Sequence, residues 1–159
     1  MPEMDREYPT RPFVGVGVVV LKGESVLLIR RGRAPRLGEW SLPGGAQQVG
    51  ETVAEAAVRE VREETGLVIE SPQLLDVVDS LVRDPDGRVR FHYTLIDFWA
   101  EWHSGEPQAG DDAQAVQWHP HEAISHLGRW DKTVEVIEKA FAVRGLTIIE
   151  KIEKGEFNS

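Results

Sequence analysis

The sequence contains no cysteine among its 159 residues. This absence excludes a disulfide framework, zinc sites with cysteine ligands and a thiol nucleophile. The sequence also lacks an apolar segment near Met1 and any hydrophobic run long enough to cross a bilayer. We therefore expect a cytoplasmic protein with no membrane partner.

Positive charge is scarce as well. The chain has 18 lysines and arginines against 27 aspartates and glutamates, which gives a formal net charge of -9. Because affinity for a nucleic-acid backbone comes chiefly from lysine and arginine, we expect no nucleic acid polymer as a partner. Positive charge is concentrated at Arg30, Arg31, Arg33 and Arg36. These side chains are candidate contacts for a small phosphate compound, although many solvated loops have a similar composition.

Length and composition fit one globular domain. A chain of 17.8 kDa with 41% hydrophobic residues is long enough to bury a core. We expect a single domain over residues 1–150 and a polar tail over residues 151–159, whose last residues resemble an addition from cloning. Helices should flank one mixed sheet. The hydrophobic patterns predict strands over residues 14–21, 25–30, 74–82, 89–100 and 115–118 and a helix over 131–143.

Local signals define a further helix in the middle of the chain. Thr52 is a good N-cap, and Glu55 three residues later completes a capping box. Gly66 supplies the left-handed residue that commonly follows the end of a helix. The sequence therefore predicts a helix over residues 53–65.

Three carboxylates share one face of this predicted helix. Glu60, Glu63 and Glu64 are one to four positions apart, so their side chains project close together and repel one another. A hard divalent cation such as Mg²⁺ is the expected partner, because carboxylate oxygens suit it better than Zn²⁺. Arg59 lies one turn from both Glu55 and Glu63, where it can hold a carboxylate in orientation. Taken alone, such a charged run is more often a solvated helix surface with salt bridges.

The whole segment from Gly45 to Leu67 resembles the signature of the Nudix hydrolases. After Gly45 come five residues and Glu51, then seven residues and Arg59-Glu60-Val61, then one residue, Glu63-Glu64, one residue and Gly66-Leu67. No position departs from the signature, and a chance match at so many fixed spacings is very improbable. The resemblance implies an α/β/α sandwich with a mixed β-sheet. It also implies hydrolysis of a nucleoside diphosphate linked to another moiety.

The resemblance further implies roles for individual residues. Glu60 and Glu64 would be the principal ligands of Mg²⁺, with Mn²⁺ as the alternative cation. Glu63 would be a direct or water-mediated ligand, and the carbonyl of Gly45 or Ala46 a further one. The remaining members of the expected site are the supporting groups Glu51 and Arg59 and the substrate contacts Arg31, Arg33, Arg36 and Gly44.

The general base is left open at this point. Members of the family place it either within the signature or on a later loop. On a later loop, Asp112 is the first candidate, followed by Asp111 and then by Glu101. An acidic pair in a loop more often faces solvent, so these assignments are hypotheses.

The substrate is predicted only as a small nucleotide. Residues 33–45, His92-Tyr93 and Trp118 show a general similarity to the small bacterial Nudix proteins described as ADP-ribose pyrophosphatase-like, which favours an ADP-ribose-like substrate. One alternative is a MutT-like hydrolase of oxidised dNTPs. Another is a nucleotide-binding sensor without catalytic activity. A homodimer would be common for the family, although no interface can be identified in the sequence.

Overall fold

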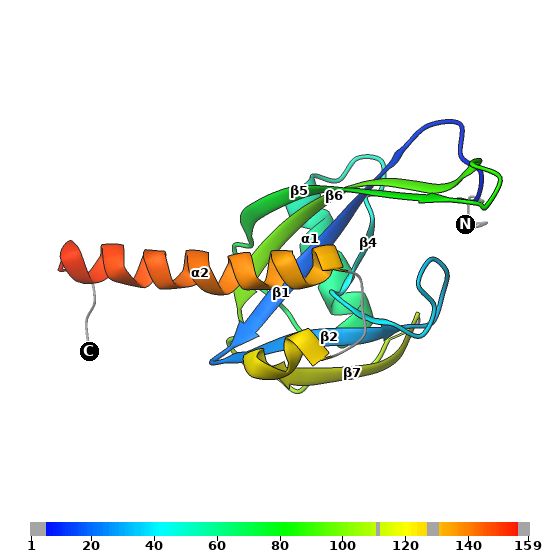
Figure 1. Cartoon of the computed structure of the whole chain (residues 1–159). Helices are drawn as coiled ribbons and strands as arrows, with labels where there is room; N and C mark the ends of the chain where they lie inside the picture. Colours follow the sequence, from blue (N-terminus) through cyan, green and yellow to red (C-terminus); the bar gives the residue numbers. More distant parts are fainter. Residues whose placement is uncertain (1–5, 111, 127–130, 156–159) are drawn as a thin grey trace.

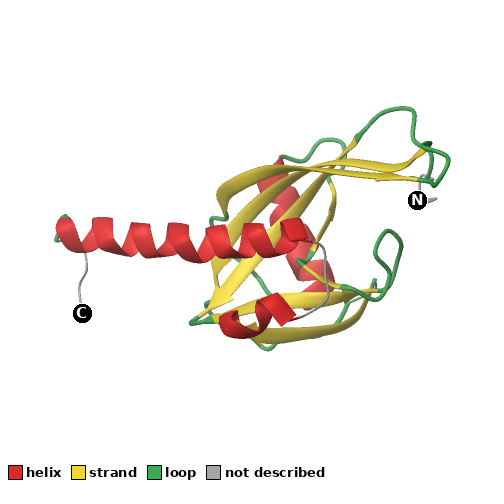
Figure 2. Cartoon of the chain, viewed as in Figure 1, coloured by secondary structure: helices red, strands yellow, loops and turns green. Residues whose placement is uncertain are grey.

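The computed structural model describes residues 6–110, 112–126 and 131–155. In these residues a mixed β-sheet lies between helices (Figure 1; Figure 2). The predicted α/β/α sandwich is therefore confirmed. In chain order the elements are β1 (Phe13–Lys22), β2 (Ser25–Arg31), β3 (Trp40–Ser41), β4 (Gly44–Ala46), α1 (Val53–Thr65), β5 (Gln73–Arg83), β6 (Val89–Glu101), β7 (Ala113–Pro120), the 3-10 helix η1 (His121–His126) and α2 (Asp131–Glu153).

Strand β1 organises the sheet. It runs parallel to β6, with Phe13 opposite Tyr93 at one end of the pairing. Its other edge pairs antiparallel with β4 at Gly15 to Gly17 and with β2 near its end. Strand β5 pairs antiparallel with β6, and β3 and β7 both pair antiparallel with β2. The first half of β1, with its glycines, therefore lies between β4 and β6.

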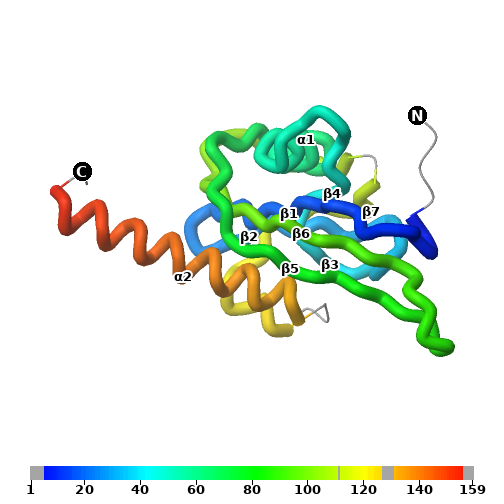
Figure 3. The backbone as a smooth tube through the Cα atoms, turned by 90° about the horizontal axis from the view of Figure 1, so that it is seen from above, coloured from blue at the N-terminus to red at the C-terminus, as the bar shows by residue number. Residues whose placement is uncertain are grey.

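The helices cover opposite faces of the sheet (Figure 3). Because side chains alternate along a strand, Val16, Val18 and Val20 of β1 pack toward α1, whereas Val19 and Leu21 pack toward α2. Each face buries its own apolar cluster. On the α1 side the helix contributes Ala56, Ala57 and Val61, and on the other side η1 and α2 contribute Ile124, Val136, Ile137, Ala140 and Phe141.

Helix α1 begins and ends as its local signals predict. The backbone N–H of Glu55 donates to Thr52 Oγ1 at 3.1 Å, and the Glu55 side chain accepts from the Thr52 N–H at 3.2 Å. Gly66 follows the helix with a φ of 76°, a conformation that residues with a Cβ adopt less readily. The predicted bounds, residues 53–65, are confirmed.

Helix α2 is longer than the sequence predicts. We expected it to end at Val143, but it continues to Glu153 and passes the domain boundary that was placed at residue 150. The last turns carry Leu146, Ile149 and Ile152 at helical spacing, but all three side chains are exposed. Because these side chains are not buried, packing against the core could not have predicted this part of the helix. In the part of the chain that the structure describes, no helix is both long and apolar enough to cross a membrane.

Candidate active site

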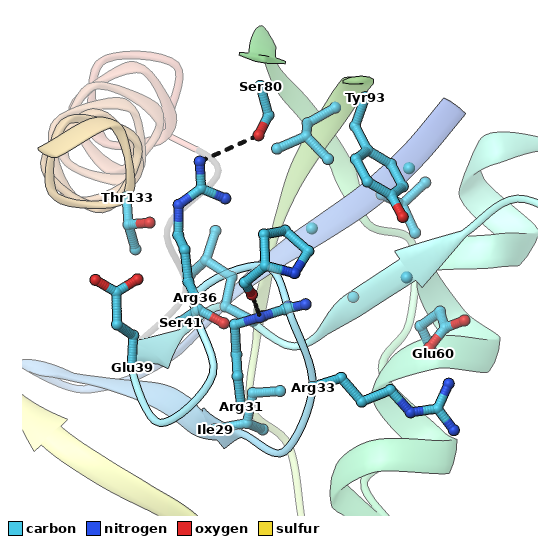
Figure 4. Close-up of a pocket in the computed structure, with 18 of the residues that line it drawn as sticks. Ile29, Arg31, Arg33, Arg36, Glu39, Ser41, Glu60, Ser80, Tyr93 and Thr133 are labelled. Atoms are coloured by element: carbon cyan, nitrogen blue, oxygen red, sulfur yellow. Dashed lines mark hydrogen bonds between the residues drawn. The ribbon is translucent and has the colours of Figure 1, made fainter. Parts of the chain in front are cut away.

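A cleft of about 270 Å³ lies beside the first half of β1. Its lining comes from β1, β2, β4, α1, β5, β6, α2 and the loop before β3. Two glycines of β1 leave room for side chains of β6 that line it. A Cβ on Gly15 would lie 2.9 Å from Leu95 Cδ2, and a Cβ on Gly17 would lie 2.5 Å from Asp97 Oδ1. Glycine in a strand weakens the sheet, and here it lets neighbouring side chains lie over the backbone. Figure 4 shows the labelled side chains around this cleft.

Two carboxylates of the signature face the Gly-rich strand β4 across the cleft. Glu60 and Glu64 both line the cleft, together with Gly45. A Cβ on Gly45 would lie 2.5 Å from Glu60 Oε1, so only glycine lets the carboxylate approach this strand so closely. The carboxylates of α1 and the backbone of β4 therefore meet at one place.

Arg59 holds three carboxylates of the signature. Its Nε and Nη2 donate to the two oxygens of Glu51 at 3.0 and 2.7 Å, and its Nη1 donates to Glu60 at 2.8 Å and Glu63 at 3.1 Å. Nη2 also donates to the carbonyl oxygen of Ala46 at 3.0 Å. The hydrogen bonds to Glu51 are the largest cause of the raised pKa of Arg59, and they lower the pKa of Glu51. Arg59 thus fixes α1 to the segment that follows β4.

Glu64 is the most strongly perturbed acid of the site. It is 8% exposed, and its Oε2 has no hydrogen-bond partner among the described residues. Burial, followed by the charge of Glu60, raises the pKa of Glu64 to about 9, although Arg31 and the Gly44 N–H act in the opposite direction. A second carboxylate beside a buried one costs free energy unless a cation lies between them.

These residues fit a hard divalent cation. Glu60, Glu64 and the carbonyl of Gly45 offer oxygen atoms only, which suits Mg²⁺ or Mn²⁺. Glu63 differs from the other two acids, because its side chain does not line the cleft and is 54% exposed. Its carboxylate forms an ion pair with Arg59 instead. Within the described ranges, no three His, Cys, Asp or Glu side chains form a ready metal cluster. The structure thus brings together two of the three carboxylates that the sequence pointed to.

The arginines of the loop segment separate into two groups. Arg31, Arg33 and Arg36 line the cleft, whereas Arg30 is exposed and donates to the Gly38 carbonyl. Burial lowers the pKa of Arg31 and of Arg36. Arg31 Nε donates to the carbonyl of Pro35 at 2.7 Å, which fixes its guanidinium inside the loop (Figure 4). Three of the four arginines therefore lie where a phosphate could reach them.

The candidates for the general base lie in different places. Asp112 lines the cleft but is half-exposed, and its Oδ1 lies 2.7 Å from Arg33 Nη2. Asp111 lies outside the described residues. Glu101 ends β6, 3.9 Å from Arg144 Nε, and does not line the cleft. Of the described candidates outside the signature, Asp112 alone lines the cleft.

The structure adds polar residues that the sequence analysis did not identify. Glu39, Ser80, Asp97 and Thr133 line the cleft from the loop, β5, β6 and α2. Arg36 Nη2 donates to Ser80 Oγ at 3.2 Å, so the loop is tied to β5 (Figure 4). Only Asp97 left a signal in the sequence, because a carboxylate interrupts the apolar strand there. The other three become neighbours only through the fold.

Comparisons with known proteins show which family the chain is similar to. The model of the NUDIX domain matches residues 11–140. A protein of Methanocaldococcus jannaschii named ADP-ribose pyrophosphatase is 43% identical over 106 residues, which cover 67% of this chain and 60% of that protein. The uncharacterized Nudix hydrolase YvcI of Bacillus subtilis is 34% identical over 109 residues, 69% of this chain and 66% of that protein. The chain thus spans less than two thirds of the length of both relatives.

A solved structure shows the same fold. The MutT NUDIX hydrolase from Burkholderia pseudomallei superposes with a TM-score of 0.69 at 32% identity and covers 81% of this chain and 98% of its own. The residues that the NUDIX model matches include the whole signature from Gly45 to Leu67, together with β1 and the beginning of α2 as far as Ala140. The chain therefore belongs to the Nudix family.

Proposed function

We propose that the protein is a divalent-metal-dependent hydrolase that cleaves the pyrophosphate bond of a nucleoside diphosphate linked to another moiety, with ADP-ribose as the favoured substrate. One observation carries the proposal. Glu64 is buried beside Glu60, and its Oε2 has no hydrogen-bond partner in the described part of the chain. A cation between these carboxylates would remove the cost of their charges. The same cleft contains arginines for the phosphates of a substrate.

In this proposal the carboxylates of Glu60 and Glu64 and the carbonyl of Gly45 hold Mg²⁺ or Mn²⁺, and Glu63 reaches it directly or through water. Bound there, the cation would neutralise phosphate charge and lower the pKa of the attacking water. Arg59 keeps Glu60 in place through the hydrogen bond at 2.8 Å. The role of Arg59 is therefore to position a ligand and not to contact the substrate.

The remaining groups act on the substrate. Arg31, Arg33 and Arg36 would bind phosphate oxygens, with Gly44 close to them in the Gly-rich strand. A water oxygen forms a bond to phosphorus while the bond from that phosphorus to the bridging oxygen breaks, and the bridging oxygen leaves with the second phosphate. Asp112 is the proposed acceptor of the proton that the water loses. Its carboxylate forms an ion pair with Arg33 at the edge of the cleft.

Support for an ADP-ribose-like substrate comes from the archaeal relative named ADP-ribose pyrophosphatase, at 43% identity. A second candidate is hydrolysis of oxidised dNTPs. It is favoured by the likeness, at 32% identity, to the structure named as a MutT NUDIX hydrolase. Both reactions would use the same carboxylates and differ in the organic group that the cleft accepts.

The test is a panel of ADP-ribose, dNTPs including oxidised forms, dinucleoside polyphosphates and nucleotide sugars, assayed with Mg²⁺ and identified by product. We expect AMP and ribose 5-phosphate from ADP-ribose as the dominant activity. Glu64→Gln should abolish turnover, whereas Glu70→Gln, at an exposed position outside the cleft, should retain it. Preferred release of pyrophosphate from oxidised dNTPs would support the second candidate. Absence of Mg²⁺-dependent products across the panel would instead favour a nucleotide sensor.

A further inference from the structure

Asp97 is a buried carboxylate that the proposed chemistry does not use. It lines the cleft from β6 and is only 4% exposed. No residue in the described ranges donates a hydrogen bond to it or forms an ion pair with it. Burying a carboxylate without a partner opposes folding, so the fold gains nothing from this side chain that an apolar residue would not supply. A polar group of this kind, inside a cleft, is a candidate ligand contact.

The sheet register places Asp97 away from the carboxylates of α1. Gly17 of β1 is paired with Gly44 of β4 on one side and with Asp97 on the other. Two strand spacings, about 10 Å, therefore separate the backbone of Gly44 from that of Asp97. A ribose and a nucleobase can bridge such a span when the phosphates lie near the Gly-rich strand. Asp97 thus lies at the end of the cleft where the organic group of a nucleotide would be.

Gly17 also gives the Asp97 carboxylate its position. Asp97 Oδ1 lies 2.5 Å from the point that a Cβ of Gly17 would occupy, and Leu42 Cδ1 lies 3.6 Å from the same point. The carboxylate therefore leans over β1 into space that only glycine leaves open, with an apolar side chain beside it. A flat group in contact with Leu42 would bring its polar edge to the carboxylate.

The charges around Asp97 favour its neutral form. Asp76 of β5 lies opposite Asp97 in the sheet. The nearby cation of α2, Lys139, pairs with Asp76, with 3.4 Å between Lys139 Nζ and Asp76 Oδ2. Lys132 of α2, which also lines the cleft, donates to the backbone carbonyl of Asp79. Burial, with a smaller effect of Asp76, raises the pKa of Asp97 to about 7. A neutral carboxylic acid presents an O–H donor next to a carbonyl acceptor.

We propose that Asp97 determines substrate specificity by binding a nucleobase edge on which a hydrogen-bond donor lies next to an acceptor. The amino group and the neighbouring ring nitrogen of adenine form such an edge. The acid donates to the ring nitrogen and accepts from the amino group, so the hydrogen-bonding groups of both partners are satisfied. This inference rests on the proposed function, because it assumes that the phosphates lie at the carboxylates of α1.

The test compares two substitutions of similar size. Asp97→Asn keeps a donor and an acceptor, whereas Asp97→Leu keeps neither. Binding is measured by titration calorimetry with Mg²⁺, using the non-hydrolysable methylene analogue of ADP-ribose and, as a control without a base, inorganic pyrophosphate. We expect Asp97→Leu to weaken binding of the analogue about 10- to 100-fold and Asp97→Asn to change it less than about threefold. Neither substitution should change the affinity for pyrophosphate.

A matched control is Asp76→Asn, which removes the neighbouring charge at a position that does not line the cleft. It should leave the affinity for pyrophosphate unchanged and alter that for the analogue less than about threefold, because Asp76 is the smaller cause of the raised pKa of Asp97. The inference is overturned if Asp97→Leu weakens both ligands equally, which indicates a structural role, or if it weakens neither. Absence of hydrolysis alone would not overturn it. A wild-type protein that shows no hydrolysis but binds the analogue through Asp97 would be a nucleotide-binding protein with the same base contact.

Discussion

Replacing Asp97 by asparagine should make the protein more stable in neutral and alkaline solution. The pKa of this carboxyl rises from 3.8 to about 7 on folding, chiefly because burial disfavours the charged form. At about 1.4 kcal/mol for each pH unit, keeping Asp97 ionised in the folded protein costs about 4 kcal/mol above pH 7. Asparagine has nearly the same shape and carries no charge at any of these pH values.

The sign of the pH dependence follows from proton binding. Between pH 4 and 7 the folded protein keeps a proton on Asp97 that the unfolded chain has lost. The contribution of Asp97 to stability is therefore complete below about pH 4 and is lost as the pH rises through 7. The quantity to follow is the free energy of unfolding of Asp97→Asn minus that of the wild type. This difference should be about 3 kcal/mol larger at pH 8 than at pH 5.

Urea unfolding, followed by tryptophan fluorescence at pH 5, 6, 7 and 8, measures this quantity. The other ionisable groups are common to both proteins, so their contributions cancel in the difference. Any gain or loss from the new amide is the same at each pH and also cancels. A difference in unfolding free energy that stays constant within about 0.5 kcal/mol over this range would refute the argument, because Asp97 would then titrate alike in both states.

Two further substitutions test the metal-binding half of the cleft. Gly45→Ala should lower kcat/KM with Mg²⁺ at least 100-fold, because the new Cβ would lie 2.5 Å from the Glu60 carboxylate; Gly145→Ala, where no atom lies within 4 Å, should leave it unchanged. Arg59→Lys should lower kcat at least 10-fold and the free energy of unfolding by about 1–3 kcal/mol, because lysine cannot form the bidentate contact with Glu51. Retained kcat in Arg59→Lys would show that this contact does not position the site.

The helix of the signature could be predicted from the sequence because its signals are local. Thr52, Glu55 and Gly66 lie within one segment, and capping depends on residues three or four positions apart. Helical spacing also predicted the contact from Arg59 to Glu63, which the structure contains at 3.1 Å. The contacts of Arg59 with Glu51 and Glu60 were not predicted. The contact with Glu51 joins α1 to the segment before it, so helical spacing does not indicate it.

Other features depend on pairing between distant residues. Strand β1 lies beside β6 in parallel, and nothing in the sequence fixes that register. The position of Asp97 opposite Gly17 therefore could not be predicted, although the carboxylate in an apolar strand and the glycine in another are each unusual. The short strands β3 and β4 were missed because two or three residues contain no measurable periodicity.

The division of the cleft between α1 and β4 on one side and β6 on the other gives the fold an advantage in changing specificity. The groups that would bind the metal belong to α1 and β4, whereas Asp97 belongs to β6 and is separated from them by the glycines of β1. A substitution on β6 can alter which base is accepted without moving Glu60 or its contact with Arg59, because β6 does not carry either residue. Catalysis and recognition should therefore respond independently to mutation, as distant sites without shared contacts do.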